Sequence, residues 1–174
     1  MERLITRLAL ASATVGGAVL VALVIMTCAS IAGRALIDFG LSPVKGDFEL
    51  LEAGIAFAVF SFLPLCQLRA GHATVDVFTS ALPDGVNRVL LAFWEVIAAL
   101  TLGLIAWRLG AGLVQKIGNG ETTYLLQFPV WWSYAACLVA AVVAVIVAVW
   151  SAADRVRAVA TGRDTRPISA ESTH

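Results

Sequence analysis

Residues 67–76 read Gln-Leu-Arg-Ala-Gly-His-Ala-Thr-Val-Asp, a polar break between two long apolar segments. The break contains Arg69, His72 and Asp76, in a chain that is 60% hydrophobic. If this stretch is helical, His72 and Asp76 lie four residues apart on one face, and apolar side chains recur at helical spacing on another. The pattern predicts a short amphipathic helix over residues 72–82 that lies at a membrane surface.

The bulk composition places the chain in a membrane. Only 14% of its 174 residues are charged and its mean hydropathy is +0.89, whereas soluble proteins are roughly 25% charged. Lys plus Arg and Asp plus Glu balance at 12 each, so the formal net charge is zero. Because no basic field exists to hold a phosphate backbone, we expect no nucleic-acid partner.

The apolar runs predict an all-α integral membrane protein with four transmembrane helices, the short surface helix lying between spans two and three. The predicted spans cover residues 8–33, 50–68, 86–113 and 129–152. They form one membrane domain over 1–153, and a polar cytoplasmic tail is expected over 154–174. The first run is longer than the core of a signal peptide, usually about 7–15 residues, so we expect an uncleaved helix.

Local motifs add detail to these spans. Small residues in the first span, including Gly16 and Gly17, permit close helix packing. Asp47 is predicted to cap the second helix. Trp131 and Trp132 begin the fourth span, where an interfacial belt of aromatic side chains is expected.

The distribution of basic residues predicts the orientation, because four spans place both termini on one side. The terminal side carries Arg3, Arg7, Arg69, Arg88, Arg155, Arg157, Arg163 and Arg166, and the other side carries Arg34, Lys45, Arg108 and Lys116. The excess of positive charge favours both termini in the cytoplasm.

Glu95 is the acid that lies well inside an apolar run. Burying such a group costs about 2.5–3.5 kcal/mol on insertion scales, which makes it a functional candidate. One interpretation is a proton or cation site of a transporter. The other is a carboxylate that is paired across helices or reaches water or a neighbouring subunit, with Arg88 close enough for partial relief by snorkelling.

Catalytic and cofactor chemistry finds little support in the sequence. His72 has one other histidine to pair with, the terminal His174, so haem held by two histidines within the chain is not expected. A catalytic triad lacks its nucleophile, and an exposed pair of His72 with Asp76 is the simpler reading. Three isolated cysteines form no metal or redox motif. We therefore expect no enzyme activity, no metal and no cofactor.

A set of motifs in order along the chain resembles a known family. The set comprises Arg34, then Glu49 and Glu52, then the Arg69–Asp76 element, and then Glu121-Thr-Thr ahead of Pro-Val-Trp131-Trp132. This order is similar to the small, DctQ-like membrane subunit of tripartite ATP-independent periplasmic (TRAP) transporters, over roughly residues 8–150.

The resemblance implies a non-enzymatic subunit of the bacterial inner membrane, surrounded by lipid. It implies a large DctM-like membrane subunit that carries substrate and sodium sites and moves as an elevator, and a periplasmic DctP-like protein that delivers an organic anion. The small subunit would act as a scaffold for the large membrane subunit.

The resemblance also implies roles for the polar side chains. Arg34, Glu49, Glu52 and Glu121 would lie on the periplasmic side, where they touch the binding protein or hold loops. Glu95 would meet the large subunit or shape the bundle. The alternative function is a self-sufficient small cation-coupled transporter that uses Glu95.

Overall fold

Four long helices make up most of residues 2–69 and 84–161, the parts of the chain that this computed structural model describes. The elements are α1 (Glu2–Ala35), the short 3-10 helix η1 (Ile37–Phe39), α2 (Asp47–Leu68), α4 (Asp84–Asn119) and α5 (Trp131–Thr161). The predicted surface helix over 72–82, with His72 and Asp76, lies outside the described residues.

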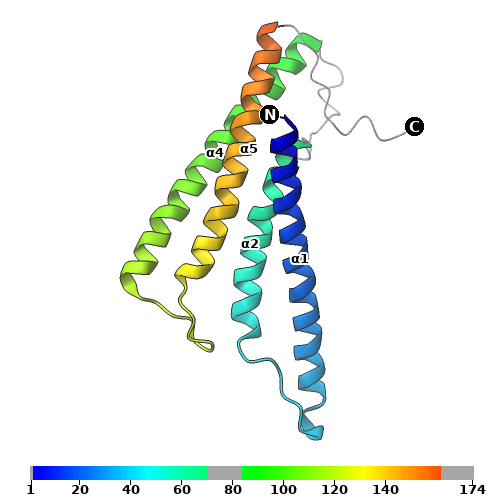
Figure 1. Ribbon diagram of the computed structural model, residues 1–174, viewed down its shortest axis with the longest axis vertical. Helices are drawn as coiled ribbons and strands as arrows, with labels where there is room; N and C mark the ends of the chain where they lie inside the picture. Colours follow the sequence, from blue (N-terminus) through cyan, green and yellow to red (C-terminus); the bar gives the residue numbers. More distant parts are fainter. Residues whose placement is uncertain (1, 70–83, 162–174) are drawn as a thin grey trace, which may run out of the picture.

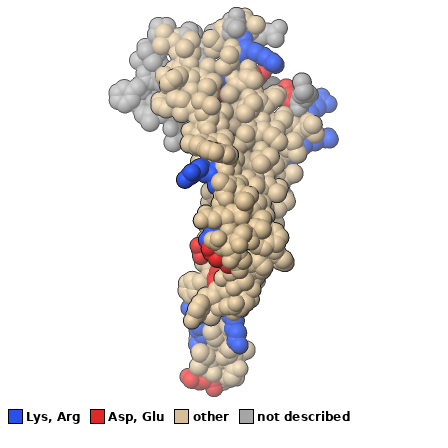
Figure 2. Space-filling view, turned by 90° about the vertical axis from the view of Figure 1, so that its left-hand side faces the viewer, with Lys and Arg blue, Asp and Glu red and all other residues tan. Residues whose placement is uncertain are grey.

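Each of the four long helices is long and apolar enough to cross a membrane. The 34 residues of α1 extend about 51 Å at 1.5 Å per residue, well beyond a hydrocarbon core of roughly 30 Å. Seen from the side, most of the surface is uncharged (Figure 2). The prediction of an all-α membrane protein with four spanning helices is confirmed.

The helices stand in a row in the order α4, α5, α2, α1 (Figure 1). We call the end where α1 begins and α5 ends the terminal end. The opposite end, with η1 and the 120–130 loop, is the loop end. The helices fan apart toward the loop end (Figure 1). Because α5 and α2 occupy the middle of the row, most tertiary contacts run through them.

Small side chains allow α1 and α2 to pack closely. A Cβ atom added to Gly16 would lie 2.7 Å from the Cβ of Ser61 on α2, whereas one added to Gly17 meets nothing within 4 Å. The hydroxyl of Ser12 donates to the carbonyl of Ser61 at 3.0 Å. The predicted small-residue contact is therefore made through Gly16, on the face of α1 toward α2.

Alanine forms the buried stripe of α5. Ala140, Ala144, Val147 and Ala148 are nearly or fully buried and recur at three- and four-residue intervals. The stripe continues through Ser151 and Ala152 to Ala158 (buried). A helix with this pattern buries one face along its whole length, which suits its place between α4 and α2 in the row.

The helices differ in extent from the predicted spans because a chain leaving the membrane can remain helical. α4 continues to Asn119, past the predicted end at residue 113. α5 begins at Trp131, because Pro129 lies in an isolated bridge with Thr122 ahead of the helix. The end of α5 at Thr161 carries helical structure into the segment expected to be tail.

Candidate functional site

A buried polar cluster joins three helices near the terminal end. The side-chain amide of Gln67, on α2, donates to Oε2 of Glu95, on α4. Nε of Arg155, on α5, lies 3.0 Å from Oε1 of the same carboxylate. The side chains of Glu95 and Arg155 are only 9% and 15% exposed. Both carboxylate oxygens are therefore bound, and the negative charge has a cationic partner within the protein.

The partners of Glu95 come from segments that sequence reasoning did not connect to it. Arg155 was assigned to the tail and Gln67 to a polar break. A signal for Arg155 exists in the sequence, because it lies four residues after Ser151 and three before Ala158, on the buried face of α5. Extending the helical periodicity beyond Trp150 would have placed Arg155 toward the neighbouring helices.

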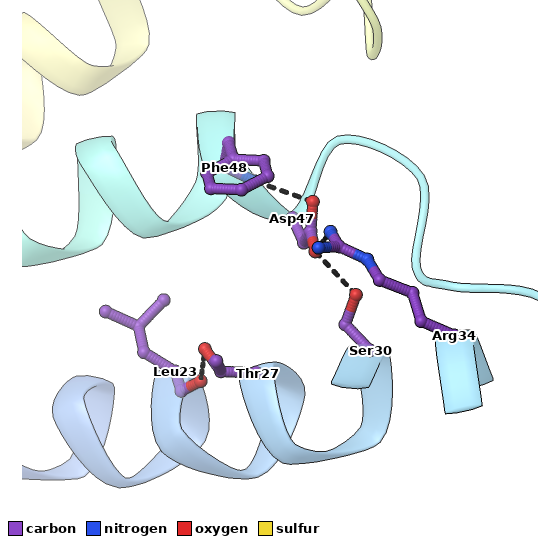
Figure 3. Close-up of polar contacts among 6 residues, drawn as sticks. All are labelled: Leu23, Thr27, Ser30, Arg34, Asp47 and Phe48. Carbon is purple, nitrogen blue, oxygen red and sulfur yellow. Dashed lines mark hydrogen bonds and ion pairs between the residues drawn. The ribbon is translucent and has the colours of Figure 1, made fainter. Parts of the chain in front are cut away.

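A second cluster joins α1 to the start of α2 at the loop end (Figure 3). Oδ2 of Asp47 accepts from the hydroxyl of Ser30 at 2.5 Å and from Nη2 of Arg34 at 2.8 Å. Oδ1 accepts from the backbone N–H of Phe48 at 3.0 Å, and the Arg34 guanidinium lies 5.5 Å from the centre of the Phe48 ring. Ser30 is 1% exposed, so its hydroxyl is shielded from solvent and binds Asp47 instead.

The prediction that Asp47 caps the second helix is wrong. Gly46 occupies the cap position with a left-handed backbone, φ +72°, and Asp47 is the first helical residue. The Asp47 carboxylate turns toward α1, where the buried Ser30 hydroxyl and the charged Arg34 guanidinium both bind its Oδ2 atom. Arg34 was singled out from the sequence, whereas Ser30 and the partnership with Asp47 were not.

Glu49 connects α2 to the loop between α4 and α5. Its Oε1 accepts from the backbone N–H of Leu125 at 2.6 Å, and its Oε2 accepts from that of Leu126 at 2.9 Å. The side chain of Leu126 lies against Gly46, where an added Cβ would overlap it. Glu49 was expected either to touch the binding protein or to hold a loop, and in the structure it holds this loop.

The same loop is closed on itself by Glu121. Glu121 pairs with Lys116 from the last turn of α4, and its Oε1 accepts from the side-chain amide of Asn119 at 2.9 Å. The N–H of Val130 donates to the carbonyl of Glu121 at 3.0 Å. The hydrogen bonds from Lys116 and Asn119 hold the pKa of the Glu121 carboxyl below its ordinary value of 4.5, against a smaller opposing effect of desolvation.

A cleft of about 480 Å³ lies between α2, α5 and this loop. Its polar lining includes Glu49, Glu52, Thr123 and Tyr124. Its apolar lining includes Ala56, Phe60, Leu109 and Cys137. The sequence singled out both carboxylates but gave no sign that they share a cavity, because the loop that covers them comes from more than 70 residues later in the chain.

The remaining predicted residues lie apart from these clusters. Arg69 is exposed just after α2, and its N–H donates to the carbonyl of Leu65 at 3.1 Å. Trp131 and Trp132 are exposed at the start of α5, with ring centres 6.0 Å apart in an edge-to-face arrangement. This position is compatible with an aromatic belt, which stays a prediction.

Within the described residues, no group of three His, Cys, Asp or Glu side chains is arranged to hold a metal ion. Cys28, Cys66 and Cys137 are not joined in a disulfide. The polar clusters are built from carboxylates bound to Arg, Lys, amide and hydroxyl donors. Such arrangements hold helices and loops together.

The chain was also compared with known proteins. A family model described as tripartite ATP-independent periplasmic transporters, DctQ component, matches residues 23–158. The match covers well over half of the chain and includes all the polar clusters described above. No curated protein matches the chain.

Proposed function

Because the chain belongs to the DctQ component family of tripartite ATP-independent periplasmic transporters, we propose that it acts as a scaffold for the large membrane subunit. In this proposal, the DctM-like subunit moves the substrate and couples its uptake to sodium. A periplasmic DctP-like protein delivers the substrate, an organic anion. The small permease subunit holds the static part of its large partner in the membrane.

The observation that carries this proposal is the single row of helices. α4 packs mainly against α5 and α1 mainly against α2, so these two helices form the edges of the row (Figure 1). Large exposed side chains lie along both edge helices: Val21, Val24 and Ile25 on α1, and Leu100, Leu104 and Trp107 on α4. A single row of helices with exposed apolar side chains at its edges suits packing against a larger membrane protein.

The contacts of Glu95 favour a structural role for this acid. A coupling carboxylate must gain and lose a proton or cation, whereas Glu95 binds Arg155 and Gln67 through both oxygens. This supports the scaffold over the alternative of a self-sufficient small transporter that uses Glu95.

The orientation is part of the proposal. We place the terminal end in the cytoplasm of a bacterium, across its inner membrane, and the loop end in the periplasm. Arg3, Arg7, Arg155 and Arg157 lie on helix ends at the terminal end, which agrees with the preference of basic residues for the cytoplasm. Arg34, Glu49, Glu52 and Glu121 then lie on the side of the binding protein.

Reconstitution tests whether transport requires the large subunit and the binding protein in addition to this chain. The chain is placed in liposomes alone, or together with a large TRAP subunit and its binding protein, and sodium-driven uptake of an organic acid is measured. We expect uptake only from the complete system. Uptake by this chain alone would overturn the proposal.

The Glu95→Gln variant separates the two roles of this acid. Uptake is expressed per assembled complex, with Asp154→Asn, which removes an exposed carboxylate of α5, as a matched control. We expect fewer complexes for Glu95→Gln but unchanged uptake by each. Loss of uptake in complexes that assemble normally would contradict the scaffold and favour a transport role.

A further inference from the structure

The cleft at the loop end changes character along its length. Glu49, Glu52, Thr123 and Tyr124 form its polar part. Along α2 the lining continues through Ala53 and Ala56 to Phe60 and is apolar. From Glu52 to Phe60 is eight residues, or about 12 Å of helix at 1.5 Å per residue. An occupant that fits both parts is therefore amphipathic, with a polar group beside the carboxylates and a chain along α2.

The charge of the polar part indicates the sign of that group. Glu49 is held by the N–H groups of the loop, whereas Glu52 has no hydrogen-bond or ionic partner among the described residues. No Lys or Arg of the described residues lines the cleft, and two cations at the same end are engaged elsewhere, since Lys116 pairs with Glu121 and Arg34 with Asp47. The cleft therefore carries an uncompensated negative charge at Glu52, which favours a cation.

The rest of the lining favours the same ligand. Tyr124 and Tyr134 line the cleft together with Glu52, and aromatic side chains attract ammonium groups. The hydroxyl group of Ser133 supplies a donor for a phosphate next to the ammonium. The volume, about 480 Å³, lies in the range of pockets that hold small molecules.

We propose that this cleft binds a phospholipid with a primary ammonium headgroup, such as phosphatidylethanolamine. The ammonium donates hydrogen bonds to Glu52, and an acyl chain lies against Ala56, Phe60 and Cys137. A lysine side chain from a partner protein would satisfy Glu52 but leave the apolar part of the cleft unfilled. An anionic lipid would fill the apolar part but bring a further negative charge to the carboxylates of Glu49 and Glu52.

Native mass spectrometry of the full-length chain in detergent tests the site. Delipidated protein is titrated with dioleoyl phosphatidylethanolamine or dioleoyl phosphatidylglycerol. We expect the ethanolamine lipid to bind preferentially, and Glu52→Gln to weaken its binding roughly tenfold, as expected for a lost hydrogen bond to a charged group. Binding of the glycerol lipid should not weaken in this variant.

Two further variants test whether the lipid preference arises in this cleft. Asp38→Asn removes an exposed carboxylate of η1 at the same end that does not line the cleft, so it should leave lipid preference unchanged. Ala56→Phe fills the apolar part and should reduce binding of both lipids. Circular dichroism checks that each variant is folded. Equal binding of the two lipids by the unmodified chain, or an unchanged preference in Glu52→Gln, would overturn the proposal.

Discussion

Nε of Arg155 lies 3.0 Å from Oε1 of Glu95, so the last turns of α5 are tied to α4 by a buried ion pair. Gln67 binds the other carboxylate oxygen and brings in α2. Three helices are thus joined at the terminal end, which is the opposite end from the fan of helices in Figure 1. The cluster therefore holds α2 against the α4–α5 pair at the end from which the helices diverge.

Removing one partner of this ion pair should cost more than removing both charges. Arg155→Met leaves the carboxylate of Glu95 buried without its cation, a change that typically costs about 3–5 kcal/mol. Adding Glu95→Gln removes the unpaired charge and keeps the amide contact with Gln67, so we expect most of that stability to return. Thermal unfolding of the detergent-solubilised chain, followed by circular dichroism, measures the series. A double variant less stable than Arg155→Met would contradict the pairing.

The Ser30 hydroxyl should contribute to the contact between α1 and α2. Ser30→Ala removes a donor to the charged Asp47, which is worth about 1.5–3 kcal/mol. Thr27→Val is the matched control, because the Thr27 hydroxyl donates within α1 to the carbonyl of Leu23 at 2.8 Å (Figure 3). Unfolding measurements should separate the two variants, and equal losses would show that Ser30 has no special role.

Periodicity and composition predicted the four helices because each helix satisfies its own backbone and turns apolar residues to lipid. These requirements act locally, so apolar runs such as residues 8–33 reveal them directly. The contact at Gly16 was predicted for the same reason: a small residue on a membrane helix permits close approach. The exact helix ends were less accessible, since α4 stays helical to Asn119 through polar residues.

The polar clusters depended on pairings between distant segments. Glu49 was singled out, but its partners, Leu125 and Leu126, contribute backbone N–H groups, which carry no residue-type signal. Glu95 was also singled out, while Arg155 was hidden by an early end to the fourth span. Candidate acids were therefore found from their rarity in apolar sequence, and their partners were found only from the fold.

Gly16 and Gly17 should respond very differently to the same substitution. At Gly16 an added Cβ meets the Cβ of Ser61 at 2.7 Å, and a Cβ moves only with its backbone, so α1 and α2 must separate. Overpacking of this kind costs about 1–3 kcal/mol. Gly17→Ala has open space and should cost nothing. The difference in unfolding midpoint between Gly16→Ala and Gly17→Ala measures the effect, and equal midpoints would exclude a close contact at Gly16.

Acid should loosen the loop that Glu121 closes. Because the pKa of Glu121 is held below 4.5 by Lys116 and Asn119, its contribution is present above pH 4.5 and is lost as the pH falls through the lowered pKa. Tryptophan fluorescence, with Trp131 and Trp132 close in sequence, follows this change from pH 6 to pH 3. Subtracting the curve of Glu121→Gln isolates the contribution of this carboxyl, and identical curves would contradict the prediction.

Gly46 should be more sensitive than Gly40 to replacement by alanine. Both glycines have a left-handed backbone, φ +72° and +83°, so both variants carry strain of about 1–2 kcal/mol. An added Cβ meets nothing within 4 Å at Gly40, whereas at Gly46 it overlaps the side chain of Leu126. The Leu126 side chain is 37% exposed and can turn aside, so Gly46→Ala should cost only about 0.5–1.5 kcal/mol more in an unfolding experiment.

A second substitution shows where that extra cost arises. Leu126→Ala removes the overlapping atoms but keeps the backbone N–H that donates to Glu49 at 2.9 Å. Combined with Gly46→Ala, it should restore stability to near that of Leu126→Ala with Gly40→Ala. An unchanged deficit in the combined variant would mean that backbone strain at Gly46, and not contact with the loop, determines the cost.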